Sequence, residues 1–124
     1  MDAQHTKHVT SKLAYHFVWC PKYRKKILVG RLATFVEQEI RRICEANTWT
    51  IGAFNVQEDH VPLFLSAPPS VAPSQIAHTL KGTTARKVFQ GFPQVKKHLW
   101  GGAFWSRSSS VGSVGEMSVD TVLK

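Results

Sequence analysis

The first clear pattern in the chain is an alternation of side chains over residues 12–20. Leu13, Tyr15, Phe17 and Trp19 lie at every second position, and the positions between them are also largely apolar. Successive side chains of a strand point to opposite faces. The pattern therefore predicts a strand that is covered on both faces, in the middle of a sheet.

Two further strand patterns follow. Residues 49–56 are rich in β-branched and aromatic side chains, and residues 60–66 form a second such run. The polar residues 57–59 between them are short enough to be the turn of a hairpin. Position 62 is a proline, which has no N–H to donate, so it indicates the start of a strand or an edge position.

Two segments have apolar side chains at helical spacing, one between the first two strands and one after the third. After Gly30, apolar side chains recur every three or four positions, at Leu32, Phe35, Val36, Ile40, Ile43 and Cys44. This period predicts a helix that packs on a sheet and ends near Asn47. A second helix is expected to start at Pro73 and to end at Gly91 and Pro93. Strand, helix, strand, strand is half of a split βαβ arrangement, an α+β design.

The two ends of the chain have weaker patterns. Residues 103–105 and 111–115 are expected to be two short strands with serines between them, and Ser118 is expected to cap a further helix. The first residues are polar without apolar periodicity. We therefore expect a flexible N-terminus at 1–11 and a single domain at 12–124.

Composition restricts the class of partner. The 124 residues include 16 Lys and Arg against 8 Asp and Glu, with a net charge of +8 and an isoelectric point near 9.9. There is no membrane-length apolar run and no signal-peptide pattern, so we expect a cytoplasmic protein with a polyanionic partner and no membrane. Cys20 and Cys44 match no zinc spacing and are expected to be reduced, buried thiols.

The positive charge is clustered. Four cations surround Tyr23 in the first cluster, namely Lys22, Arg24, Lys25 and Lys26. This combination favours phosphate contacts with a base stacked on the tyrosine. The second cluster follows one side of the second helix and mixes cations with hydroxyls, which suit phosphate oxygens better than a core. Its members are Lys81, Thr83, Thr84, Arg86 and Lys87. Residues 96–98 add a further basic piece, and a solvated surface without a partner remains the alternative.

His60 carries the most distinctive chemistry of the chain. With a second histidine two positions later it would form a two-pronged metal site on a strand, which could polarise a phosphodiester. Position 62 holds Pro62 instead, which has no lone pair to offer a metal. A half-exposed structural histidine is therefore the alternative to a metal ligand at His60.

Several motifs together resemble one family. They are the run Tyr15-His16-Phe17-Val18-Trp19-Cys20-Pro21-Lys22-Tyr23-Arg24-Lys25-Lys26, then Asp59-His60-Val61, Ser66-Ala67-Pro68-Pro69, Pro73-Ser74-Gln75-Ile76, Leu80-Lys81-Gly82, Leu99-Trp100-Gly101-Gly102 and Val111-Gly112-Ser113-Val114-Gly115. From about Leu13 to Lys124 the sequence resembles the single-tyrosine HUH transposases of minimal bacterial insertion sequences, also called TnpA.

The resemblance implies a ferredoxin-like fold, with an antiparallel sheet and helices on one face, that works as a homodimer. Such enzymes bind single-stranded hairpin DNA at insertion-sequence ends. A His-x-His pair holds Mg²⁺ or Mn²⁺ and polarises the scissile phosphate, and a tyrosine attacks it to form a phosphotyrosine intermediate.

This chain departs from the family at the chemistry. The first metal histidine corresponds to His60, but the second corresponds to Pro62. The nucleophilic tyrosine and a metal-binding glutamine one turn later are expected just beyond Lys124. The resemblance therefore implies a domain that is truncated at the start of its C-terminal helix and catalytically inactive.

The departures lead to one main hypothesis and three alternatives. The chain is expected to bind hairpin DNA without cleaving it, as a homodimer or as a heterodimer with a full-length transposase. The first alternative is an active transposase with rebuilt chemistry, in which Glu58 or Asp59 replaces the lost histidine and Tyr23 or a serine attacks. The second is a ferredoxin-like RNA-binding module. The third is a gene remnant whose product folds poorly and has no function; a cooperative thermal melt would argue against it.

Overall fold

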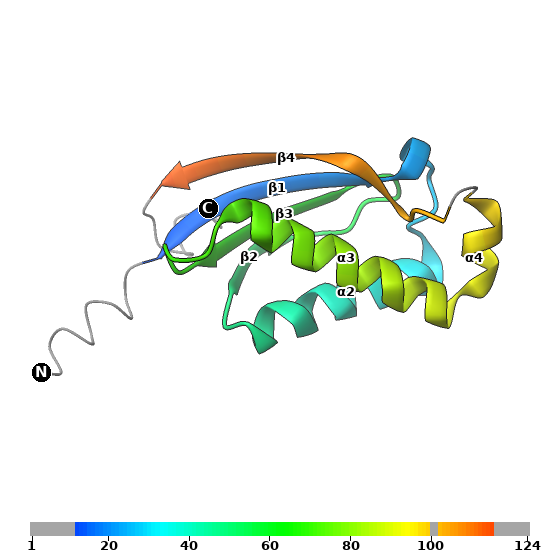
Figure 1. The fold of residues 1–124 in the computed structure, drawn as a ribbon, viewed down its shortest axis with the longest axis horizontal. Coiled ribbons are helices and arrows are strands. Elements are labelled where there is room, and N and C mark those ends of the chain that lie inside the picture. The colour runs from blue at the N-terminus through cyan, green and yellow to red at the C-terminus, as the bar shows by residue number, and fades with distance from the viewer. Residues whose placement is uncertain (1–11, 100–101, 116–124) are drawn as a thin grey trace, which may run out of the picture.

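The structure, a computed structural model, describes residues 12–99 and 102–115. Along the chain the elements are β1 (Leu13–Pro21), the 3-10 turn η1 (Lys22–Arg24), α2 (Gly30–Ala46), β2 (Thr50–Phe54), β3 (Val61–Ala67), α3 (Pro73–Gly91), α4 (Pro93–His98) and β4 (Trp105–Gly115). Figure 1 shows the strands as one layer, with α2 and α3 side by side along one of its faces.

The four strands form one antiparallel sheet in the order β2-β3-β1-β4. β1 therefore lies in the interior, as its two apolar faces predict, and β2 and β4 are the edges. This order, with both long helices on one face, is the ferredoxin-like split βαβ arrangement. The α+β fold expected from the sequence is confirmed.

The core lies between the sheet and the two long helices. Phe17 and Trp19 of β1 point into it and are at most 1% exposed, whereas His16 and Val18 point to the opposite face and are half-buried. That face carries no helix of the described chain (Figure 1). Among the described residues, the sheet thus has one face that is packed against helices and one face without helices.

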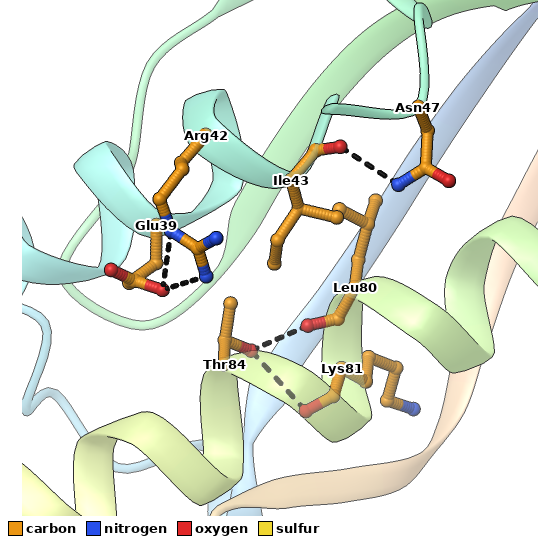
Figure 2. Close-up of polar contacts among 7 residues, drawn as sticks. All are labelled: Glu39, Arg42, Ile43, Asn47, Leu80, Lys81 and Thr84. Atoms are coloured by element: carbon orange, nitrogen blue, oxygen red, sulfur yellow. Dashed lines mark hydrogen bonds and ion pairs between the residues drawn. The ribbon is translucent and has the colours of Figure 1, made fainter. Parts of the chain in front are cut away.

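The first long helix matches its predicted bounds closely. Its stripe of Val36, Ile40 and Ile43 is at most 4% exposed. The Asn47 amide Nδ2 donates to the Ile43 carbonyl at 2.8 Å, and this bond satisfies a carbonyl at the end of the helix, as Figure 2 shows. Asn47 therefore ends α2 where the sequence predicts.

The second half of the sheet differs from the prediction in two ways. The two short strands expected at 103–105 and 111–115 are one continuous strand, β4, which begins at Trp105 and includes the serines. Ser109 and Ser110 pair with Trp19 and Val18 of β1. Backbone pairing with a buried neighbouring strand thus outweighs the low strand propensity of serine here.

The second difference concerns the start of β3. The strand begins at Val61, so His60 precedes it, and Pro62 is its second residue. Pro62 pairs with Val18 on the β1 side, while the β2 ladder reaches only Leu63. The missing N–H of Pro62 therefore lies at the start of the strand, as one of the two sequence interpretations requires.

Both cysteines are free thiols, but only Cys44 is fully buried. Cys20 was expected to be buried as well; it is only half-buried because it lies on the sheet face without helices. No helix in the described ranges is long and apolar enough to cross a bilayer. The flexible segment expected at 1–11 and the helix expected from Ser118 lie outside the described residues.

Candidate functional site

One end of the sheet gathers most of the candidate residues. Trp19, near the end of β1, pairs with Val61 at the start of β3. His60 and the η1 turn therefore lie at the same end of the strands. The Lys22 N–H donates to the Phe104 carbonyl at 2.9 Å, which ties the turn to the segment before β4. α4 lies at this end as well (Figure 1).

Asp59 connects His60 to the basic turn. Its Oδ2 accepts a hydrogen bond from Arg24 Nε at 3.1 Å, and its Oδ1 lies 2.8 Å from His60 Nδ1. The hydrogen bonds from His60 and from Arg24 lower the pKa of Asp59, so the carboxylate is ionised at neutral pH. An ionised carboxylate only accepts. In the neutral imidazole Nδ1 therefore carries the proton, and Nε2 keeps the lone pair.

The described residues do not fit a divalent metal site around His60. Within residues 12–99 and 102–115 there is no group of three His, Cys, Asp or Glu side chains that could hold an ion together. Pro62 offers no ligand atom, and Asp59 already bonds His60 and Arg24. Glu58 faces Lys26, with 3.9 Å between its Oε1 and the Lys26 Nζ. His60 is thus a single ligand that is held in a metal-competent tautomer.

The basic turn is preorganised by its backbone and its ion pairs. Tyr23 and Arg24 both have left-handed backbone angles, with φ of 62° and 50°. The Arg24 pair with Asp59 holds the turn on one side, and Lys25 Nζ donates to the His98 carbonyl at 3.5 Å on the other. Asp59 and Glu58 neutralise part of the charge that the sequence cluster suggests, because Arg24 and Lys26 lie beside them.

Thr84, which the sequence assigned to a phosphate-binding surface, is a core residue. Its side chain is fully buried, and its hydroxyl oxygen accepts a hydrogen bond from Trp105 Nε1 at 2.8 Å. The same hydroxyl donates to the Leu80 carbonyl at 2.7 Å, with the Lys81 carbonyl nearby at 3.2 Å (Figure 2). Leu80, Thr84 and Val88 lie at helical spacing on one face, so Thr84 packs with the core stripe.

Lys81 lies beside β4. Its Nζ donates to the carbonyls of Arg107 at 3.2 Å and Ser108 at 3.4 Å, which joins α3 to the edge strand. Partial burial lowers the pKa of Lys81. The structure thus gives the Lys81 ammonium two protein partners in addition to any phosphate contact that the sequence predicts for it.

The other candidates on α3 do not converge on one point. Arg86 is exposed, and Thr83 and Lys87 are half-buried. At 100° per residue, Thr83 and Lys87 lie on one flank of the buried stripe and Lys81 on the other. Arg86 points away from the core. The α3 cations therefore surround the helix, whereas the η1 cations are concentrated at one end of the sheet.

Two features of this end were missed by the sequence reasoning. From the sequence, Asp59 is predicted only as a substitute metal ligand, although a carboxylate that bonds a histidine commonly orients its ring. Lys97 and His98 are predicted only as part of a basic segment. They line a hollow together with Tyr23 and Lys25, and the spacing along the chain gives no signal for this contact.

Comparison with known proteins identifies the family. The family model described as "Transposase IS200 like" matches residues 9–124. The ISDra2 transposase TnpA of Deinococcus radiodurans is 40% identical over 105 residues, which cover 85% of this chain and 75% of that protein. The transposase for insertion sequence element IS200 of Salmonella typhimurium is 28% identical over 115 residues, 93% of this chain and 76% of the relative.

Solved structures agree with this assignment. The crystal structure of a Deinococcus radiodurans protein described as a transposase superposes with a TM-score of 0.77 at 35% identity, over 90% of this chain and 85% of that one. A REP-associated tyrosine transposase bound to a REP hairpin shares the fold, with a TM-score of 0.63 at 12% identity, over 89% of this chain and 60% of that one. On the match of nearly its whole length to the family model, this chain belongs to the IS200-like transposase family.

Proposed function

We propose that this member of the transposase family binds single-stranded hairpin DNA at insertion-sequence ends and does not perform metal-dependent strand transfer with its described residues. The proposal rests on one end of the sheet, where the cationic η1 turn and the His60 imidazole are both held by Asp59. Pro62 stands there in the place of a second metal ligand. The hairpin carried by the fold relative described above supports the class of ligand.

Recognition of DNA is assigned first to the basic turn. Tyr23, Lys25 and Lys26 are exposed there, and Lys22 is half-buried. Arg24 holds the turn through Asp59 while its guanidinium remains largely exposed. Exposed lysines contact phosphates as point charges, and the Tyr23 ring offers a surface for a base. Arg86, Lys87 and Thr83 extend the basic surface along α3, and Lys81 contributes charge next to β4. Because phosphate contacts release counterions, affinity should fall steeply with salt.

The chemistry proposed for His60 is limited to binding. Its Nε2 can accept a hydrogen bond or act as one metal ligand, but a phosphorane needs charge stabilisation from several directed groups. The reaction of this family also uses a tyrosine as the nucleophile. Of the two tyrosines in the sequence, Tyr15 is buried in the core, at 6% exposed, and Tyr23 lies on the basic turn. We propose that Mg²⁺ or Mn²⁺ binds weakly at most.

The test uses labelled DNA hairpins taken from the genomic DNA that flanks the gene. Anisotropy should show tighter binding to these hairpins than to a random duplex of equal length, with a log–log salt slope of about −0.7 to −0.9 per phosphate contacted. Incubation with Mn²⁺ followed by a denaturing gel should show no covalent adduct. Equal affinity for hairpin and duplex would refute the binding proposal, and a covalent band would refute the inactive chemistry.

One observation favours a second candidate, the RNA-binding module. His16 and Phe64 are stacked on the sheet face without helices, with ring centroids 4.2 Å apart and an interplanar angle of 12°. Aromatic side chains on such a face stack with bases of single-stranded RNA in other ferredoxin-like modules. An RNA hairpin of the same sequence discriminates the two, because the RNA candidate requires it to bind more tightly than the DNA.

The oligomeric state belongs to the same proposal. We propose a homodimer, or a heterodimer with another transposase of the family. Light scattering of the purified chain, alone and mixed with such a relative, tests both. The rebuilt-chemistry alternative gains no support from the ion pairs, because Glu58 and Asp59 both face cations of the turn.

A further inference from the structure

Another hollow lies between the first turns of α2 and the residue that joins α3 to α4. It has a volume of about 540 Å³ and is lined by Gly30, Arg31, Thr34, Phe35, Gln38 and Phe92. This volume lies within the range of roughly 300–1,000 Å³ that ligand sites occupy. The lining contains two aromatic rings, one guanidinium, one hydroxyl and one amide, and no carboxylate. Its chemistry therefore suits an apolar group with a negative charge beside it.

Two phenylalanine rings form the apolar part of this α2 hollow. Phe35 and Phe92 are both half-buried, and their ring centroids lie 5.4 Å apart at an interplanar angle of 63°. The Phe92 backbone is held between two helices, because its N–H donates to the Val88 carbonyl at 2.7 Å and its carbonyl accepts from the Val95 N–H at 2.9 Å. The rings thus present a fixed apolar surface that the fold only partly covers.

The apolar surface continues beyond the hollow at Val29. This residue precedes Gly30 and is 54% exposed, one of three large hydrophobic residues that are exposed in the described chain. The space beside Gly30 is open, because a Cβ built on it would meet nothing within 4 Å. Exposed apolar surface next to a hollow marks contacts with other proteins. The apolar area is therefore wider than the hollow itself.

The positive charge at the hollow has no partner among the described residues. The other two arginines of α2 form ion pairs on the helix surface. Arg41 Nε lies 3.1 Å from Glu37 Oε2, and a distance of 2.7 Å joins Arg42 Nη2 to Glu39 Oε1. Arg31 forms no ion pair with a described residue, and the first turn of α2 contains no acidic residue. An unpaired guanidinium can bind a carboxylate through two parallel N–H bonds.

We infer that the α2 hollow is a docking site for a partner protein that presents an aromatic side chain next to a carboxylate. The aromatic side chain packs on Phe35 and Phe92, and the carboxylate bonds the Arg31 guanidinium. A protein partner fits better than a nucleic acid, because successive phosphates need several cations and the hollow supplies one. The inference goes beyond the proposed function, since it assigns a second kind of partner to a different surface.

The experiment follows the backbone amides of the full chain by NMR during titration with short peptides. The probe is acetyl-Gly-Phe-Asp-Gly-amide, and versions with Phe-Asn and Ala-Asp are the matched controls. The Phe-Asp peptide should cause saturable shifts at Arg31, Thr34 and Phe92. The Phe-Asn peptide should bind about two- to fivefold more weakly, because it lacks an exposed ion pair. The Ala-Asp peptide should bind more weakly still, because it lacks the ring.

Variants of the protein test the same two contacts. Arg31→Gln should remove the preference for the Phe-Asp over the Phe-Asn peptide. Arg42→Gln removes the same charge from the same helix outside the hollow, and it should keep that preference. Phe35→Leu should weaken binding of the Phe-Asp peptide by about twofold or more, because an aromatic pair is lost. Thermal melts show whether each variant is folded.

Three outcomes would overturn the inference. The first is the absence of saturable shifts at the hollow, or equal affinity for the Phe-Asp and Phe-Asn peptides. The second is displacement of the peptide by excess DNA hairpin, which would place the hollow in the nucleic-acid interface. The third is a set of shifts at the hollow that depend on protein concentration without any peptide, which would identify a second copy of this chain as the occupant. Failure of hairpin binding alone would leave the peptide result intact.

Discussion

The hydrogen bond between Thr84 and Trp105 gives the sharpest test of the packing between α3 and β4. Thr84→Val keeps the shape of the side chain and its branching, and it removes the oxygen that accepts from Trp105 Nε1 at 2.8 Å. Thr84 is fully buried and Trp105 is 6% exposed, so the indole N–H has little access to water as a replacement. A buried donor without a partner costs about 1–3 kcal/mol.

The measurement is equilibrium unfolding in urea. With a slope of about 2 kcal/mol per M, a loss of about 2 kcal/mol lowers the unfolding midpoint by about 1 M. Thr83→Val is the matched control, because it makes the same change at the neighbouring, half-buried position of the same helix. Its effect should stay within about 0.5 kcal/mol.

The pairwise origin of the effect is tested by a double-mutant cycle with Trp105→Phe. Removal of both partners should cost less than the sum of the single changes, by about 1 kcal/mol. The reasoning would be refuted if Thr84→Val were no more destabilising than Thr83→Val, or if the two changes added without coupling. In that case Thr84 would belong to the surface that the sequence suggested.

Three further predictions concern a hydrogen-bonded carboxylate, a buried thiol and a lysine that joins two elements. The hydrogen bonds that lower the Asp59 pKa below its usual value of 3.8 stabilise the fold above that pH, and this stabilisation is lost as pH falls through the folded-state pKa. The urea midpoints of wild type and Asp59→Asn should therefore converge in acid. The difference between wild type and Glu58→Gln should not disappear in the same pH range. Burial raises the pKa of Cys44 to about 12, so iodoacetamide at pH 8 should label it only when the protein unfolds, and mass spectrometry of native samples checks this. Lys81→Met should speed amide hydrogen exchange in the first half of β4, because two carbonyls there lose a donor; Lys87→Met should leave this exchange unchanged.

The sequence predicts the elements of this fold well where one period dominates. The alternation over 12–20 and the stripe from Leu32 to Cys44 both locate their elements, because each depends on neighbours within a few positions. The central place of β1 follows from its two apolar faces. The sequence predicts two short strands on either side of the serines, because strand propensity depends on residue type alone. It does not include the backbone pairing with β1 that keeps β4 continuous.

The candidate site was predicted less well, because its contacts join distant positions. Arg24 and Asp59 are 35 residues apart, and Lys25 and His98 are 73 apart, so no local pattern reports either contact. Thr84 was assigned to a surface from its polar type. Its spacing of four residues from Leu80 and from Val88 indicates the core, but the apolar stripe of α3 is weak. The sequence also gives no sign of the Trp105 side chain that bonds the buried hydroxyl.

The left-handed turn at Tyr23 and Arg24 has a consequence for how this chain can evolve. A glycine at either position would adopt the observed backbone without the penalty that a Cβ brings, about 1–2 kcal/mol at each residue. Selection for stability alone would therefore favour glycine there, at the loss of the exposed ring or of the guanidinium that holds Asp59. A chain that keeps both bulky residues retains a less stable turn in exchange for what their side chains contact, which is the form that a stability–activity trade-off takes. Homologues that have lost selection for nucleic-acid binding should accumulate glycine or asparagine at these two positions first.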